Sequence, residues 1–196
     1  SKTIGEERGP IPWREAVSLF TGLLDAVAYA HKKGVIHRDL KPENVMLTSE
    51  GQLRILDFGI AKRVGDAKTK TGTGMGTVDY MAPEQYTDAS KVDARADVYA
   101  LGMTLYEMLA GRLPWDAGQT EFAVLALKAK GSLPPPTRFY PDIPPELVKT
   151  LMLALEVDVG HRYKQVAKFQ AALNQAVDEA AAPDVQERRE SRHQNS

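Results

Sequence analysis

The first hydrophobic pattern along the chain has the period of an α-helix. It runs from Pro12, a residue that suits the first helical position, to Gly34, which ends it. One face of this stretch carries residues at helical spacing, namely Val17, Phe20, Leu24, Val27 and His31. The spacing predicts an amphipathic helix whose apolar face packs against the body of a domain.

Short runs of apolar and β-branched residues come next, at 35–37, 45–47 and 53–56. Polar segments separate these runs, so the pattern predicts short strands, with a turn at 49–51 between the last two. Residues 60–80 show no sustained periodicity and are rich in glycine, threonine and lysine. This composition predicts a mobile loop.

The remaining hydrophobic patterns predict helices. Residues 96–110 contain few polar side chains, and a helix that is apolar on nearly every side belongs in the middle of a domain. Amphipathic stretches predict further helices at about 120–130, 145–156 and 164–180. The proline-rich segment 134–145 predicts a rigid connection. The fold class is therefore α+β, mainly α-helical with short β-hairpins.

Composition excludes several classes of protein. The apolar fraction of 43% and the charged fraction of 26% are those of a soluble globular protein of one domain, or of a large piece of a bigger one. A net charge of −1 argues against nucleic acid as a partner. No apolar run approaches the roughly 20 residues of a membrane-spanning helix. The absence of cysteine excludes disulfides and thiolate metal sites.

Two motifs carry residues suited to phosphoryl transfer, which are His37-Arg38-Asp39-Leu40-Lys41-Pro42-Glu43-Asn44 and Asp57-Phe58-Gly59. Such a reaction needs a proton acceptor for a hydroxyl and cations on the phosphate oxygens. The Asp39 carboxylate can take the proton, and the Lys41 ammonium can stabilise phosphate charge. Asn44 and Asp57 offer the oxygen ligands that Mg²⁺ prefers. Phe58 is an apolar anchor beside the second of these ligands.

With Met81-Ala82-Pro83-Glu84 downstream, the motifs resemble those of the eukaryotic-like serine/threonine protein kinases, in particular bacterial members. The resemblance covers nearly the whole chain. It implies ATP and Mg²⁺ as cofactors and proteins as substrates, with Asp39 as catalytic base and Lys41 as a phosphate contact. It also implies Asn44 and Asp57 as Mg²⁺ ligands. Lys41, within Asp-Leu-Lys-Pro-Glu-Asn, resembles the serine/threonine branch rather than the tyrosine branch.

The same resemblance assigns roles to residues outside the two motifs. Thr77 is similar to the threonine of a substrate-docking loop. Glu84 is expected to form a buried ion pair with Arg162, the alternative being that both are surface charges. Asp97 looks like an aspartate that holds the backbone of the catalytic loop, and its plainer role is that of a helix N-cap; the two are compatible.

Three further residues are expected near the nucleotide or in the core. His37 resembles a residue stacked beneath Phe58, so a chemical role for its imidazole is not favoured. Met46 reads as a core residue, and the resemblance adds that it lies under the adenine ring. Glu43 belongs to the same nucleotide-binding stretch. It also falls, with Glu107, where relatives that prefer arginine before the target residue carry carboxylates.

The loop before Thr77 contains candidate phosphorylation sites, which are Thr69, Thr71 and Thr73. Arg38 directly precedes Asp39, an arrangement typical of kinases that are switched by phosphorylation of this loop. A phosphate there would pair with Arg38 and Lys62 and so order the segment. The alternative is that the threonines only make the loop polar.

The chain lacks other groups that a kinase needs, namely a glycine-rich loop over the phosphates, a strand lysine and its helix glutamate. The only glycine cluster, at 71–76, follows the Mg²⁺ motif. Residues 1–180 are therefore interpreted as a C-terminal lobe without its N-terminal lobe, with an activation segment at about 57–84. Residues 181–196 are interpreted as a disordered polar tail. We expect little activity from the chain alone.

Partners and location follow from the resemblance. The missing N-terminal lobe and a dimer for autophosphorylation are expected partners. The sequence style looks bacterial, which suits a cytoplasmic catalytic part in a parent protein anchored to a membrane beyond this chain. Two alternatives remain. A non-catalytic, pseudokinase-like interaction module is disfavoured by the intact Asp39, Asn44 and Asp57. A small-molecule kinase is disfavoured by the Lys-Pro-Glu-Asn run and by Ala82-Pro83-Glu84.

Overall fold

The computed structural model describes residues 9–47, 53–56, 77–88, 90 and 92–182 of the 196-residue chain. This part is mostly helical, as the sequence predicts, and contains one antiparallel pair of short strands. No helix in these ranges is long and apolar enough to cross a membrane. Residues 183–196 of the predicted tail lie outside the described residues, as do positions 60–76 of the predicted loop. The first residue of that tail, Ala181, is the last residue of a helix instead.

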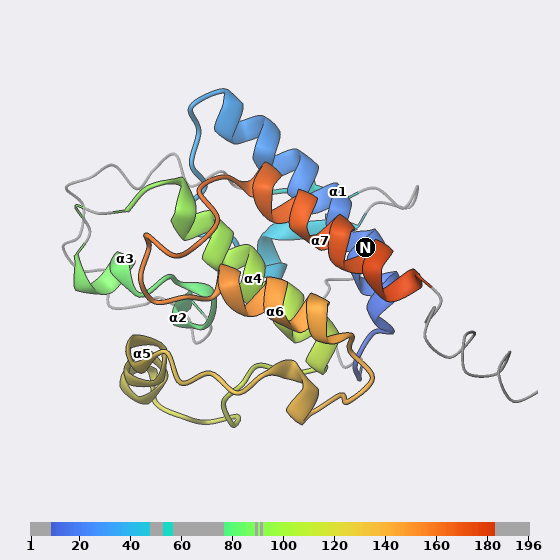
Figure 1. Ribbon diagram of the computed structural model, residues 1–196. Coiled ribbons are helices and arrows are strands. Elements are labelled where there is room, and N and C mark those ends of the chain that lie inside the picture. Colours follow the sequence, from blue (N-terminus) through green and yellow to red (C-terminus); the bar gives the residue numbers. More distant parts are fainter. Residues whose placement is uncertain (1–8, 48–52, 57–76, 89, 91, 183–196) are drawn as a thin grey trace, which may run out of the picture.

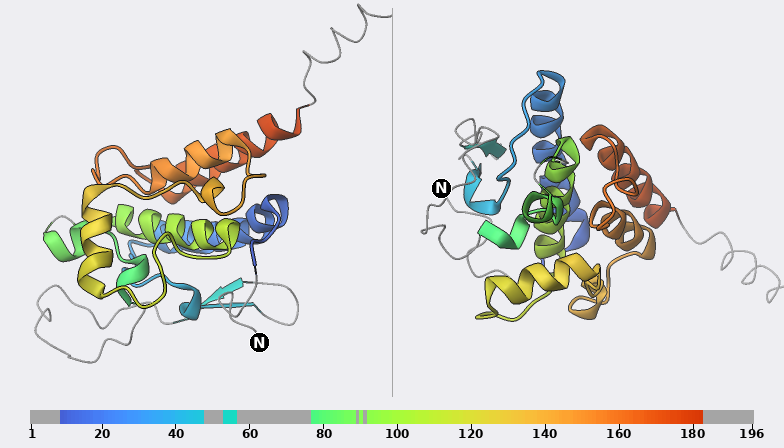
Figure 2. Two further views of the ribbon diagram at one scale, coloured as in Figure 1. Left: turned by 90° about the horizontal axis from the view of Figure 1, so that it is seen from below. Right: turned by 90° about the vertical axis from the view of Figure 1, so that its left-hand side faces the viewer.

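Helix α4 (Ala94–Ala110) forms the centre of the molecule and is buried on nearly every side, as its apolar sequence predicts. It packs against α1, α6 (Pro145–Ala154) and α7 (Val166–Ala181). Figure 2 shows α6 and α7 on one side of α4, and the strand pair on the other side. The surface of α4 that faces the strand pair also carries the candidate site.

The ends of α4 follow from local chemistry. The Asp93 side chain accepts a hydrogen bond from the Arg95 N–H and so caps the first turn, which begins two residues before the predicted start. At the other end, Gly111 has a φ of 71°, a left-handed conformation that favours glycine. A Cβ at this position would lie 2.6 Å from the backbone nitrogen of Pro10. Glycine is therefore required both by conformation and by space.

Helix α1 (Trp13–Lys32) is the amphipathic helix that the first pattern predicts, with Pro12 as its N-cap rather than its first residue. Its buried face comprises Ala16, Val17, Phe20, Leu23, Leu24, Val27 and Ala30. It contacts α4 and α7, and its C-terminal end leads into the loop that carries Asp39 (Figure 1).

The prediction of a strand at 35–37 is wrong. The Val35 N–H donates to the Ala30 carbonyl at the end of α1, and the His37 N–H donates to the Asp97 carboxylate. These donors are therefore not available to a β-ladder. Strands β1 (Val45–Leu47) and β2 (Leu53–Ile55) do pair in antiparallel register, with Val45 opposite Ile55.

Two short helices were not predicted, α2 (Thr77–Tyr80) and α3 (Glu84–Thr87). The first occupies the end of the segment that the sequence assigns to a loop. Helix α5 (Glu121–Lys130), like α6 and α7, lies close to its predicted range. The proline-rich connection before α6 contains a single 3₁₀ turn, η3 (Pro136–Arg138).

Candidate active site

The loop His37–Asn44 is held in place by Asp97 of α4, whose side chain is fully buried. The two carboxylate oxygens of Asp97 accept hydrogen bonds from the N–H groups of His37 and Arg38, each at 2.8 Å. His31 Nε2 donates to the same carboxylate at 2.8 Å. Asp97 therefore bonds the loop backbone, as expected. The plainer role of Asp97 as a helix N-cap, which the sequence left compatible with this one, is wrong, because Asp93 caps α4.

Arg38 has a φ of 65°, the only positive φ outside glycine among the described residues. For an ordinary side chain the left-handed region costs about 1–2 kcal/mol. Such strain persists only where surrounding contacts over-determine it. Here the Arg38 N–H is bound by Asp97, and its carbonyl accepts from Gln85 Nε2 at 2.8 Å. The strained residue lies directly before Asp39.

Asn44 joins Asp39 to the strand pair. Its side-chain Nδ2 donates to the Asp39 carbonyl at 2.8 Å, and its own carbonyl accepts from the Leu56 N–H at 2.7 Å. The η1 turn (Pro42–Asn44) closes with a bond from the Asn44 N–H to the Lys41 carbonyl. Because the donor nitrogen of the Asn44 amide is committed, its oxygen is the end suited to a cation.

His37 is buried, with 1% of its surface exposed. Its Nδ1 accepts from the Asp39 N–H at 3.3 Å, which leaves the proton on Nε2. That nitrogen faces the Leu56 carbonyl at 3.4 Å. These contacts suit a structural imidazole. Its expected neighbour, Phe58, lies outside the described residues. Met46 is partly buried in β1, and Glu43 is exposed on the η1 turn.

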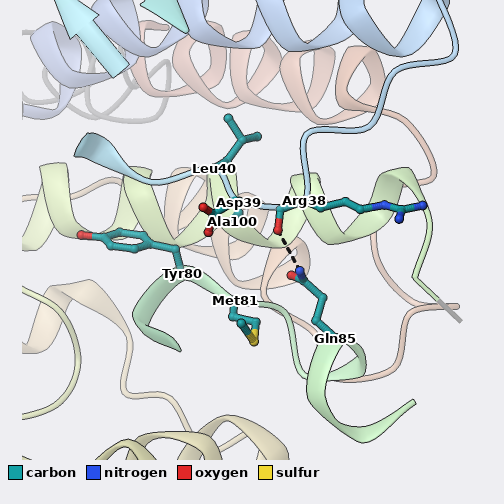
Figure 3. Close-up of a pocket in the computed structure, with 7 residues that line it drawn as sticks. All are labelled: Arg38, Asp39, Leu40, Tyr80, Met81, Gln85 and Ala100. Carbon is teal, nitrogen blue, oxygen red and sulfur yellow. Dashed lines mark hydrogen bonds between the residues drawn. The ribbon is translucent and has the colours of Figure 1, made fainter. Parts of the chain in front are cut away.

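A small pocket opens beside Asp39 (Figure 3). It is lined by Arg38, Asp39, Leu40, Tyr80, Met81, Gln85 and Ala100. These residues come from the His37–Asn44 loop, from the segment around α2 and α3, and from α4. Gln85 bridges two of these walls, because its Oε1 accepts from the Ala82 N–H while its Nε2 donates to the Arg38 carbonyl. The pocket is thus a place where a hydroxyl group of another molecule could lie beside the Asp39 carboxylate.

Tyr80 and Glu107 form a polar pair next to this pocket. The Tyr80 hydroxyl donates to the Glu107 carboxylate. Burial raises the pKa of Glu107, while its hydrogen bond to Tyr80 opposes that rise. Burial also raises the pKa of Tyr80, and the negative charge of Glu107 adds to the effect. The Glu107 carboxylate is thus partly buried and bonded to Tyr80, whereas Glu43 is exposed to solvent.

Behind Tyr80 lies a buried lysine that the sequence reasoning did not identify. Lys128 of α5 has no exposed surface, and its Nζ donates to the carbonyls of Val78, Asp79 and Met81. Burial lowers the pKa of Lys128 to about 7, and the Asp79 carboxylate opposes this shift. The three carbonyls favour the protonated form as well, since only an ammonium has three N–H donors.

Glu84 and Arg162 lie together as a buried ion pair, with two N–H···O bonds of 2.7 Å. Arg162 also donates from Nε to the Glu156 carbonyl, and from its two terminal nitrogens to the carbonyls of Arg95 and Val157. All five N–H donors of the guanidinium are thereby used. The alternative, that both residues are surface charges, is wrong. The pair links α3, beside the pocket, to the segment before α7.

Several predicted site residues lie outside the described part of the chain, which are Asp57, Phe58, Lys62, Thr69, Thr71 and Thr73. Thr77 begins α2, at the edge of that part. Within the described ranges, no group of three or more histidine or carboxylate side chains could hold a metal ion. Of the two Mg²⁺ ligands expected from the sequence, Asn44 lies within the described residues and Asp57 lies outside them.

The residues that sequence reasoning missed left weak signals. His31 occupies a position on the apolar face of α1, which indicates a buried partner. Lys128 follows the buried Val124 by four residues and therefore lies on the same face of α5. Gln85 left no comparable signal, because a glutamine beside Glu84 is unremarkable in a polar turn.

Comparison with known proteins identifies relatives of the chain. A family model described as the protein kinase domain matches residues 2–175. Serine/threonine-protein kinase PknB of Mycolicibacterium smegmatis is 37% identical over 180 residues, which cover 90% of this chain and 28% of that protein. Serine/threonine-protein kinase PknL of Mycobacterium tuberculosis is 32% identical over 179 residues, covering 91% of this chain and 44% of that protein.

A third relative covers a similar share of this chain. Serine/threonine-protein kinase PrkC of Bacillus subtilis is 31% identical over 171 residues, which cover 87% of this chain and 26% of that protein. The chain thus spans between about a quarter and less than half of the length of these curated relatives.

Proposed function

This chain belongs to the protein kinase domain family, and on that premise we propose that the protein carrying it is a serine/threonine protein kinase. It would transfer the γ-phosphate of ATP to hydroxyl groups of proteins. The observation that carries the proposal is the pocket at Asp39. Asp97 holds the loop of Asp39 through two backbone N–H groups, and Asn44 of the same loop donates to the Asp39 carbonyl. The names of the three relatives agree with this activity.

In this proposal, Asp39 accepts the proton of the substrate hydroxyl as that oxygen attacks phosphorus. Lys41 contacts the transferring phosphate. Asn44 and Asp57 are the residues that would hold Mg²⁺, which supplies positive charge to the phosphate oxygens when bound. Asn44 Nδ2 donates to the Asp39 carbonyl, which supports this assignment because the amide oxygen is then the atom of the side chain that can bind a cation. Met46 would lie under the adenine ring.

The pocket suggests how a protein substrate is received. Tyr80 and Met81 form the wall opposite the His37–Asn44 loop, so a peptide along this wall would bring its hydroxyl to Asp39. We assign the docking role of this segment to residues 77–81. Glu43 is an exposed carboxylate near the site, which supports a preference for basic residues in the peptide. Glu107 would contribute to this preference only if a basic residue of the peptide replaced the Tyr80 hydroxyl as its hydrogen-bond donor.

We further propose that residues 1–180 act as the C-terminal lobe of the kinase and need an N-terminal lobe for turnover, so that the chain alone has little activity. Phosphorylation of Thr69, Thr71 or Thr73 would create a partner for Arg38 and so order the activation segment. A dimer would carry out this autophosphorylation. The catalytic part would lie in the cytoplasm, with any membrane anchor elsewhere in the parent protein.

The test compares wild type with Asp39→Asn in a protein that contains this chain and an N-terminal lobe. We expect the rate of phosphate transfer from ATP to a basic serine/threonine peptide to fall by about 10²–10⁴-fold in the variant, because the general base is lost. The dissociation constant for ATP should stay unchanged. Asp116→Asn, at an exposed aspartate, is the matched control and should retain full activity.

Equal turnover by wild type and Asp39→Asn would overturn the assignment of the base. ATP binding without any transfer by wild type would overturn the kinase proposal and favour a non-catalytic interaction module.

A further inference from the structure

We propose that Lys128 is a positioning residue, which holds the wall of the Asp39 pocket formed by residues 78–81 in the place where a protein substrate docks. The effect that we expect on catalytic turnover rests on the proposed kinase function. The structural part of the inference, that Lys128 determines the conformation of this wall, stands without that function.

Among the described residues, the hydrogen bonds of Lys128 are all made with this wall. Its Nζ donates to the carbonyls of Val78 at 2.7 Å, Asp79 at 2.5 Å and Met81 at 2.9 Å. The last carbonyls of a helix have no partner inside it. Helix α2 is a single turn, so these carbonyls need donor partners from elsewhere. An ammonium is the one side-chain group that carries three N–H donors on a single atom.

These bonds fix the backbone on both sides of the residues that line the pocket. Tyr80 and Met81 face Asp39 across the pocket, and Lys128 binds the carbonyls of Asp79 and Met81. A second bond ties α5 to the same region, from the Tyr86 hydroxyl to the Leu125 carbonyl at 2.9 Å. Helix α5 therefore supports the wall from behind, through one buried cation.

Packing alone does not explain a lysine at this position. Burial of an ammonium is costly unless it is bonded, and an apolar side chain of similar length would fill the space at lower cost. The rings of Trp115 and Tyr99 lie 5.2 Å and 5.4 Å from Nζ, where they exclude water and face the charge. Asp79 is the acidic group that acts on the charge of Lys128. What the lysine adds is directional bonding to three carbonyls.

The first test measures the wall directly and does not need enzyme activity. Amide hydrogen exchange is compared in wild type, Lys128→Met and the matched control Lys130→Met, which alters an exposed lysine on the same helix. We expect residues 77–85 to exchange at least about tenfold faster in Lys128→Met, with α1 and α7 unchanged. Lys130→Met should match wild type. Unchanged exchange in residues 77–85 of Lys128→Met would overturn the inference.

A mutant-free measurement covers the case in which Lys128→Met does not fold. In ¹⁵N-labelled wild type at about pH 6, below the pKa of Lys128, the Lys128 ammonium should give a side-chain signal that exchanges slowly with water, because it is buried and triply bonded. If every lysine ammonium of the folded chain exchanged as rapidly as an exposed one, Lys128 would not be bonded as inferred.

The consequence for function is tested in a protein that contains this chain and an N-terminal lobe. Lys128→Met should raise the KM for a protein substrate by about tenfold and leave the KM for ATP unchanged, because only the docking wall is loosened. Equal losses for both substrates would indicate general destabilisation and overturn the positioning role. If wild type itself transfers no phosphate, the proposed function fails, whereas the exchange result still decides the inference about the wall.

Discussion

The buried pair Glu84–Arg162 allows the sharpest test of the packing. Both side chains are almost fully buried, and the two bonds between them are 2.7 Å long. Glu84→Ala removes both acceptors at once. The guanidinium then keeps three carbonyl acceptors for its five N–H donors, and no carboxylate in the described part of the chain remains within bonding distance of its charge.

Breaking a buried pair in this way costs about 3–5 kcal/mol, because an uncompensated charge remains in the interior. Unfolding free energies of domains are about 5–15 kcal/mol, so this loss is a large part of the total. For a chain of this size each kcal/mol lowers Tm by about 2–4 °C, which predicts a fall of roughly 6–20 °C. Glu84→Gln keeps one carbonyl acceptor and should fall between wild type and Glu84→Ala.

The assay is urea unfolding followed by circular dichroism, with a double-mutant cycle of Glu84→Leu and Arg162→Met. The double variant should be less destabilised than the sum of the two single variants by at least about 2 kcal/mol, since neither charge remains unpaired. Asp116→Ala is the matched control. It breaks the exposed ion pair with Arg112 and should cost no more than about 1 kcal/mol. A cost for Glu84→Ala as small as that of the control would refute the reasoning.

Three further predictions concern buried groups and backbone conformation. Because the pKa of Lys128 is lowered to about 7, the unfolded chain binds a proton that the folded chain lacks between pH 7 and 10.5, so stability should rise with pH by up to about 1.4 kcal/mol per unit. A wild-type minus Lys128→Met difference that stays flat between pH 7 and 9.5 in urea unfolding would contradict this. The Tyr99 hydroxyl is buried without a hydrogen-bond partner among the described residues, so Tyr99→Phe should raise the unfolding free energy by about 1 kcal/mol, and a lower value would exclude the proposed cause. Gly111→Ala should lower Tm more than Gly34→Ala does, because both glycines have positive φ but only a Cβ at position 111 would clash with Pro10. Equal decreases in Tm would show that the contact with Pro10 does not matter.

The positions of the long helices could be read from the sequence because their signals are local. The period of Val17, Phe20 and Leu24 reports the buried face of α1 directly. The nearly unbroken apolar run of α4 likewise reports its central position. Helix starts were displaced by one or two residues, since caps such as Asp93 depend on one side-chain rotamer. The short helices α2 and α3 gave no periodic signal.

By itself, the sequence determined the family of this protein, the order of its long helices and the motif that carries Asp39, because periodicity and motif spacing are properties of neighbouring residues. Only the tertiary structure decided which partners the buried polar groups find. Lys128 donates to carbonyls that lie about fifty positions earlier in the chain, and His31 of α1 bonds the Asp97 carboxylate of α4. The backbone at 35–37 bonds α1 and α4 instead of a strand for the same reason. A buried donor takes whichever acceptor the packed elements bring near, and no local pattern records that choice.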